Sequence, residues 1–144
     1  MARVVMLLLY DCILASLAIE DFRKRKISNL YSAVILFLAV AAMAAIPEIN
    51  VTSRIYGMFA VSVPMLFFAL LLPGSFGGGD VKLTFACGAF LGWKLLLDGT
   101  VIAIFLAGIH CIWLICTKNK RENMQFALGP YLSTGYIISS FSLF

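Results

Sequence analysis

The chain has 144 residues, of which 62% are hydrophobic and only 12% are charged, and its mean hydropathy is +1.02. Soluble globular domains carry about 25% charged residues, so this composition excludes an ordinary soluble domain and predicts a polytopic, all-α membrane protein. The net charge of +4 is better explained by orientation in a membrane than by binding of nucleic acid, and we expect no nucleic-acid partner.

Six apolar segments follow one another along the chain, and each approaches the ~17–25 residues that a helix needs to cross a bilayer. They predict a single integral-membrane domain, residues 1–144, built as a bundle of about six transmembrane helices. The first segment ends without a small-residue cleavage site, so it is interpreted as a membrane helix rather than a signal peptide. The predicted spans are Val4–Ile19, Asn29–Ile46, Ile55–Leu72, Val81–Leu97, Thr100–Cys116 and Phe126–Leu143.

Short polar joints separate these spans, and their lysines and arginines predict which side of the membrane each joint faces. Eight lie at or beside the odd-numbered joints: Arg23, Lys24, Arg25, Lys26, Lys82, Lys118, Lys120 and Arg121. Three lie on the other side: Arg3, Arg54 and Lys94. Because positive charge is enriched on the cytoplasmic side, we expect cytoplasmic odd joints and extracytoplasmic termini, in the inner (cytoplasmic) membrane. The basic cluster after the first span is also expected to contact anionic lipid head groups.

Two aspartates lie at the ends of predicted spans on this cytoplasmic face, Asp21 after the first span and Asp80 before the fourth. A carboxylate at such a boundary is costly unless it is paired or used. Two carboxylates that share a site cannot both ionise cheaply, so the ionised one can take a proton from water while the protonated one donates to a carbonyl oxygen. This is the chemistry of an aspartic-type endopeptidase, which needs neither a metal nor a cofactor.

Three glycines, Gly77-Gly78-Gly79, precede Asp80. Without side chains they let a backbone approach closely, as binding of an extended peptide through its main chain requires. The structural alternative is that Asp80 caps a helix starting at Val81, a contribution of ~1 kcal/mol, and that the glycines form a hairpin. Asp21, taken alone, is explained by pairing with the basic cluster that follows it, a surface interaction of about 0–1 kcal/mol.

A second class of function also fits two acids on one face. The chain is then a non-catalytic small membrane transporter, or a pilus or secretion assembly subunit, whose acids bind an ion or a proton. The lack of an obvious inverted repeat and the few polar residues inside the spans argue against a transporter.

The other polar residues inside the spans are interpreted structurally. Asp11 lies roughly 15 Å along the helix axis from Asp21, too far to share its proton, and is expected to be paired or to face water. His110 has no second histidine nearby and no cysteines at zinc-site spacing, so we expect a packed, hydrogen-bonded histidine and no metal. Ser139 and Ser140 are expected to pack against a neighbouring helix.

Several stretches carry recognisable motifs. They are Ala18 to Asn29, in which an aspartate is followed by a basic run and Ile-Ser-Asn; Gly77 to Leu83, which reads GGGDVKL; Ala89 to Trp93; and Phe126 to Tyr131, which reads FALGPY. Together they resemble type IV prepilin peptidases, a family of GxGD membrane aspartyl peptidases, over almost the whole chain. Ser28 stands where the family usually has proline, and Leu128 where it usually has an aromatic residue.

The resemblance implies a catalytic dyad of Asp21 and Asp80 that removes the short basic leader of a prepilin-like protein at the cytoplasmic face. The family cuts just before the apolar pilin helix. It also implies roles in substrate binding or loop shaping for Gly77, Gly78, Gly79, Lys82, Asn29, Gly129 and Pro130. Lys82 and Arg23 are expected to stay in the head-group region and to position lipid or substrate.

Larger members of that family carry an insertion with paired CxxC motifs and a methyltransferase activity. This sequence has no CxxC, so we expect a peptidase only, without zinc or a methyl donor. The short form resembles the peptidases of Flp/Tad-type pilus systems, and small archaeal preflagellin peptidases share the motif, so the identity of the prepilin-like substrate stays open. The expected partners are that substrate and membrane lipids.

Overall fold

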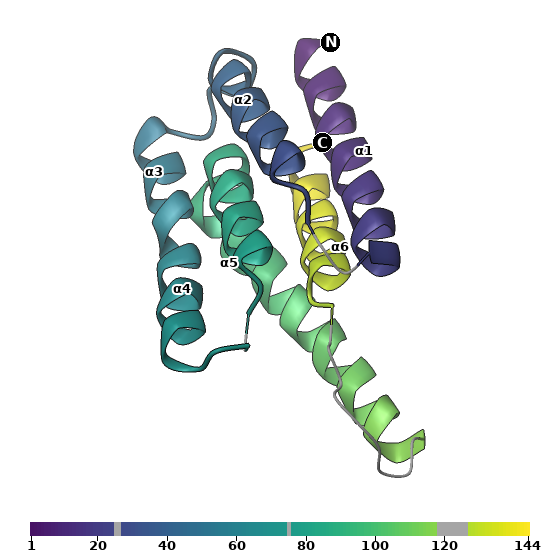
Figure 1. Cartoon of the computed structure of the whole chain (residues 1–144). Coiled ribbons are helices and arrows are strands. Elements are labelled where there is room, and N and C mark those ends of the chain that lie inside the picture. The colour runs from purple at the N-terminus through teal and green to yellow at the C-terminus, as the bar shows by residue number, and fades with distance from the viewer. Residues whose placement is uncertain (25–26, 75, 118–126) are drawn as a thin grey trace.

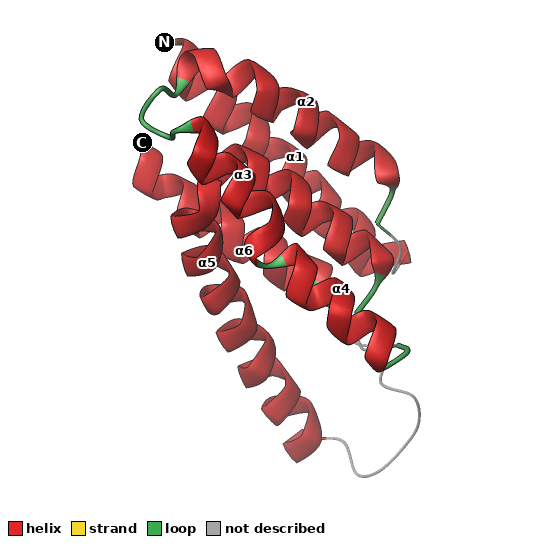
Figure 2. Cartoon of the chain, turned by 90° about the vertical axis from the view of Figure 1, so that its left-hand side faces the viewer, coloured by secondary structure: helices red, strands yellow, loops and turns green. Residues whose placement is uncertain are grey.

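The protein is all-helical in the part of the chain that the computed structural model describes, residues 1–24, 27–74, 76–117 and 127–144. Figures 1 and 2 show these ranges as a bundle of helices without strands, which confirms the predicted all-α class. Arg25, Lys26, Phe126 and the basic residues of the fifth joint lie outside the described residues. The elements are α1 (Ala2–Lys24), α2 (Asn29–Ala45), α3 (Val51–Ala60), α4 (Ser62–Leu71), α5 (Gly78–Thr117), α6 (Gly129–Ser140) and the 3₁₀ turn η1 (Phe141–Leu143).

Three helical stretches of the described chain are long and apolar enough to cross a membrane, which identifies a membrane protein. They are Ala2–Lys24, Val51–Leu71 and Gly78–Thr117. The apolar helix α2 has 17 residues, and α6 has 12. Six separate spanning helices, as predicted, are therefore not evident from length alone.

Two helix boundaries differ from the predicted ones. Helix α1 continues to Lys24, so Asp21 lies in its last turn rather than in a loop. The third predicted span begins earlier, at Val51, and is interrupted at Val61. The interruption follows from Pro64, because proline has no N–H for the carbonyl of Ala60 and its ring clashes with that carbonyl.

The predicted joint at Asp98–Gly99 is wrong, because both residues are helical within α5. The break lies instead at Gly92, whose φ of 77° and ψ of 172° are not helical. This φ belongs to the left-handed region that favours glycine. A Cβ at Gly92 would also lie 2.8 Å from both Ile49 Cγ2 and Ser53 Oγ. The fall in hydropathy at Asp98 does not interrupt the helix, whereas a glycine with a positive φ does.

The two halves of α5 run in opposite directions from Gly92. In the second half, Ser139 of α6 donates to the Leu95 carbonyl, and Tyr136, about one turn earlier in α6, lies 3.4 Å from the Thr100 hydroxyl. The second half is therefore antiparallel to α6. Figure 1 shows it, in green, running past α6 and beyond the rest of the bundle.

The first half of α5 runs alongside α6 in the same direction. The Tyr136 hydroxyl donates to Thr84 Oγ1 at 3.1 Å, and one turn before Thr84 lies Asp80, near the end of the bundle where α6 begins. Both halves of α5 therefore pack against α6, and the start of α5 lies beside the start of α6.

Glycines let α5 approach its neighbours at two crossings. A Cβ at Gly88 would overlap the carbonyl of Gly57 in α3, and a Cβ at Gly135 of α6 would overlap the carbonyl of Gly99 in the second half of α5. Such small-residue contacts are the usual way in which membrane helices pack, because lipid gives no hydrophobic drive for helices to associate.

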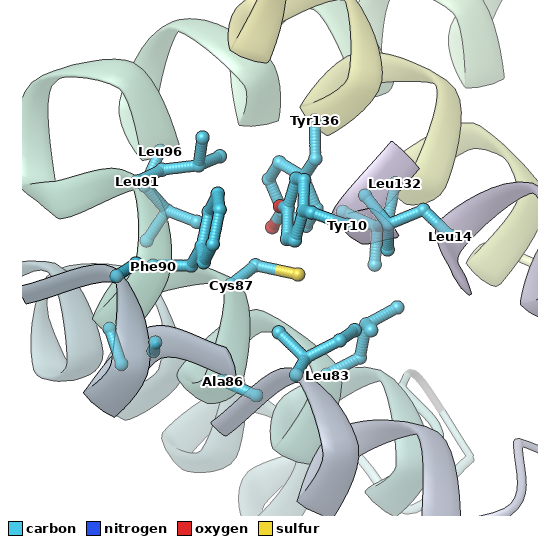
Figure 3. Close-up of a cluster of buried hydrophobic side chains, with 14 of the residues drawn as sticks. Tyr10, Leu14, Leu83, Ala86, Cys87, Phe90, Leu91, Leu96, Leu132 and Tyr136 are labelled. Carbon is cyan, nitrogen blue, oxygen red and sulfur yellow. The ribbon is translucent and has the colours of Figure 1, made fainter. Parts of the chain in front are cut away.

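The core lies where α1, α5 and α6 meet, and Figure 3 shows its side chains gathered around Cys87. The Tyr10 ring of α1 stacks on Phe90 of α5 with centroids 4.2 Å apart. Tyr136 of α6 is fully buried beside them. Cys87 thus behaves as a small apolar packing residue.

At the end of the bundle near Gly92, Arg54 of α3 is only 1% exposed. Its guanidinium donates hydrogen bonds at 3.0–3.3 Å to five backbone carbonyls. The acceptors are Ala42, Ile46, Ile49, Ala89 and Phe90. Arg54 therefore joins the end of α2 to the end of the first half of α5.

Candidate active site

Two buried carboxylates from different helices come together at the opposite end of the bundle. Asp21, in the last turn of α1, is 5% exposed, and Asp80, in the first turn of α5, is 8% exposed. The Asp21 carboxylate is close enough to act electrostatically on Asp80. The structure thus brings together the two acids that the sequence singled out, although 58 positions separate 21 from 80.

The beginning of α6 completes this end of the bundle. Gly129 is its first residue, and a Cβ there would overlap the Asp21 carboxylate and lie 3.1 Å from Ile27 Cδ1. Ile27 also packs on α5, because a Cβ at Gly79 would lie 2.8 Å from Ile27 Cβ. Ile27 therefore lies between the starts of α5 and α6. Sequence reasoning missed it, although it falls inside the motif that contains Asp21.

The carboxyl group of Asp80 is only partly satisfied. Asp80 is the third residue of α5, and its carboxylate accepts a hydrogen bond from the backbone N–H of Gly77. This is the arrangement of a capping box. Its Oδ1 is buried and has no hydrogen-bond partner among the described residues. Because α5 begins at Gly78, Asp80 lies inside the helix and is not the N-cap of a helix starting at Val81. Capping accounts for one oxygen and leaves the other without a role.

No cation pairs with either aspartate in the described ranges. The ion pairs found there are Arg3–Glu48 at 2.7 Å and Lys24–Glu20 at 2.9 Å. A nearby cation would favour the ionised form of both acids, and none is paired with them in this part of the chain.

The three glycines before Asp80 have different surroundings. A Cβ at Gly77 would lie 3.2 Å from Asp80 Oδ2, and one at Gly79 would press on Ile27. A Cβ at Gly78 would have no atom within 4 Å. Two of the glycines are therefore explained by contacts inside the protein, and Gly78 alone borders open space.

Lys82 and Asn29 contact each other rather than the aspartates. The Lys82 ammonium donates to Asn29 Oδ1 at 3.2 Å, which joins α5 to the first residue of α2. Pro130 is the second residue of α6, where a missing N–H costs nothing. A role for Lys82 towards lipid or substrate stays a prediction.

The other intramembrane polar groups have partners of their own. Ser140 donates to Asp11 Oδ1 at 2.7 Å, which confirms that Asp11 is paired. The Tyr131 hydroxyl and His110 Nδ1 are hydrogen-bonded, which confirms a packed histidine. Among the described residues, no three His, Cys, Asp or Glu side chains are grouped as a metal site would need.

Comparison with known proteins gives one consistent result. Residues 8–112 match the model of the type IV leader peptidase family. The chain is 31% identical over 136 residues to a prepilin leader peptidase/N-methyltransferase of Vibrio cholerae, covering 91% of this chain and 53% of that protein. It is 28% identical over 138 residues to the Escherichia coli protein of the same name, covering 92% of this chain and 61% of the relative.

The chain thus spans between half and two thirds of the length of these two relatives. No solved structure matches it. The family model covers well over half of the chain and includes both aspartates and the three glycines. The chain belongs to the type IV leader peptidase family.

Proposed function

We propose that this protein is an aspartic-type membrane endopeptidase that removes the leader peptide from type IV prepilin-like proteins. The observation that carries the proposal is that two buried carboxylates, Asp21 and Asp80, lie close enough to interact electrostatically, with no cation paired with them in the described part of the chain. The relatives named prepilin leader peptidase supply the substrate class.

In the proposed mechanism the pair holds one proton. The ionised carboxylate removes a proton from water as the water oxygen attacks the scissile carbonyl carbon, and the protonated carboxyl donates to the carbonyl oxygen. When the C–N bond breaks, the carboxyl that took the proton from water protonates the leaving nitrogen. The other carboxylate regains a proton from the diol. The pair ends with one proton, as it began.

The arrangement in the membrane is part of the same proposal. We assign six passes, with the two halves of α5 as separate passes because the chain reverses at Gly92. With the charge bias of the joints, this places Asp21 and Asp80 at the cytoplasmic face of the inner membrane and both termini outside. We propose an Flp-type prepilin as substrate and leader cleavage without methyl transfer.

The decisive experiment is co-expression with candidate prepilins, followed by mass measurement of the pilin product. The wild type should release the leader, and Asp21→Ala and Asp80→Ala should not. Asp11→Ala is the matched control, because it removes an acid that lies inside α1 but is bonded to Ser140. Cleavage by an Asp21 or Asp80 variant would remove that residue from the dyad. Failure of the wild type on several prepilins, with ion-dependent stabilisation instead, would favour the non-catalytic alternative.

A further inference from the structure

An apolar groove of about 590 Å³ runs along the side of the bundle between α2, α3–α4 and the first half of α5. Its walls are the hydrophobic faces of three helices. They include Ala33 and Leu36 of α2, Phe59 and Val63 of α3–α4, and Val81 and Phe85 of α5. Phe59 and Val63 are each 52% exposed, so the groove is open at the surface of the bundle.

The groove ends at Gly78, the first residue of α5. Gly78 is the glycine of the three that borders open space, and Asp80 lies two positions after it. At 100° per residue, Asp80 lies about 160° around α5 from Gly78 and Lys82, which line the groove. A chain in the groove therefore reaches Asp80 by crossing over the end of α5, where Gly78 presents no side chain.

We propose that this groove holds the apolar membrane helix of the leader-bearing substrate and that the segment before that helix crosses Gly78 to reach the two aspartates; this rests on the proposed function. The groove accepts one face of a helix rather than a whole one, because a helix with its side chains is about 10–12 Å across. Its walls are almost wholly apolar, and Ser32, Ser62 and Lys82 are the polar residues among them.

The proposed path agrees with the cleavage position that the family resemblance implies, just before the apolar pilin helix. Crossing from one side of α5 to the other is a distance of about 10 Å, which about three extended residues can span.

The occupant is a substrate helix rather than a lipid chain because the groove reaches Gly78, two positions before Asp80. A site for lipid alone needs no such connection to the aspartate end. Lys82, at this end, is held by Asn29, which keeps its side chain on the groove side of α5 and away from the aspartates.

Filling the groove tests the proposal kinetically. Ala33→Phe places a large side chain in the groove, and Ala44→Phe makes the same change at an exposed position of α2 that is not among the groove-lining residues. Ala33→Phe should raise KM by about tenfold with little change in kcat, the signature of lost ground-state binding. Ala44→Phe should leave both near the wild-type values. Equal KM values for the two variants would overturn the proposal that the substrate helix binds in the groove.

A photo-crosslinking amino acid separates the two occupants. Placed at Leu66, which lines the groove, it should capture prepilin, whereas at Phe37, a position 78% exposed and outside the groove, it should not. Capture of lipid alone at Leu66 would overturn the proposal. Cleavage by the wild type is measured in parallel. A prepilin that is cleaved but never captured refutes substrate binding in the groove. A prepilin that is never cleaved refutes the proposed peptidase function.

Discussion

The two ends of this bundle each bury ionisable side chains, and they treat them in opposite ways. At the Gly92 end, Arg54 is surrounded by five carbonyl acceptors. At the other end, Asp21 and Asp80 are both buried and close enough to interact electrostatically, and Asp80 Oδ1 has no partner in the described part of the chain. Buried polar groups are normally satisfied, and among the buried unpartnered oxygens of the described chain Asp80 Oδ1 is the one that belongs to a carboxylate. The Arg54 charge is matched by carbonyl dipoles, whereas the aspartate pair is left available for the proposed chemistry.

The largest expected effect comes from neutralising the aspartate end. Asp80→Asn should lower the cleavage rate by about 10²–10⁴-fold, the usual contribution of a general acid or base. It should not lower the thermal unfolding midpoint in detergent, because it removes a carboxyl group that is poorly satisfied. Asp11→Asn is the control and should keep the wild-type rate, since an amide oxygen still accepts from Ser140. If Asp80→Asn lowered the cleavage rate and the stability together, the contrast between a structural Arg54 end and a functional aspartate end would be contradicted.

The next effect is on stability at the other end. Arg54→Met keeps an unbranched side chain but leaves its carbonyl acceptors without a donor, and we expect a loss of about 3 kcal/mol in the free energy of unfolding. The rate of cleavage per folded molecule should stay close to that of the wild type. Denaturant titration of the purified protein measures the first quantity.

Arg3→Met is the matched control for this change. Arg3 is also an arginine near this end, but its side chain is 34% exposed; it pairs with Glu48 and donates one hydrogen bond, to the Leu143 carbonyl. An exposed pair contributes about 0–1 kcal/mol. Equal stabilities of the two variants would show that the hydrogen bonds of Arg54 do not hold this end together.

The sequence predicted the aspartate end better than the Arg54 end, for a physical reason. Asp21 and Asp80 stand out because a carboxylate beside an apolar run is unusual, and local motifs mark both. The burial of Arg54 depends on carbonyls in α2 and α5 that are far away in sequence. As one positive charge in a joint, it was informative only about topology.

The reversal in α5 could not be placed for the same reason. Hydropathy falls at Asp98, which made Asp98–Gly99 the natural joint, whereas Gly92 lies inside an apolar run. What selects Gly92 is a positive φ and the approach of Ile49 and Ser53. Neither is visible before the helices are packed.

A third substitution tests how tightly the start of α6 packs against the Asp21 side chain. Gly129→Ala should place a methyl group against the Asp21 carboxylate and Ile27. Displacing a catalytic group by about 1 Å can cost 10²-fold, so we expect kcat to fall by about 10–100-fold, with only a modest loss of stability. Gly108→Ala is the control, because a Cβ there has no neighbour within 4 Å. A fully active Gly129→Ala would mean that Asp21 need not hold its observed position.

The smallest expected effect is at Gly92, and it tests most directly whether the two ends of the bundle are independent. Gly92→Ala forces an L-residue into the left-handed region, at a cost of about 1–2 kcal/mol, and places its Cβ against Ile49 and Ser53. Thermal unfolding should show this loss, whereas kcat per folded molecule should not change, because the proposed dyad lies at the opposite end of the first half of α5. If kcat falls along with stability, the reversal at Gly92 also sets the position of Asp80, and the two ends then act as one unit coupled through that half-helix.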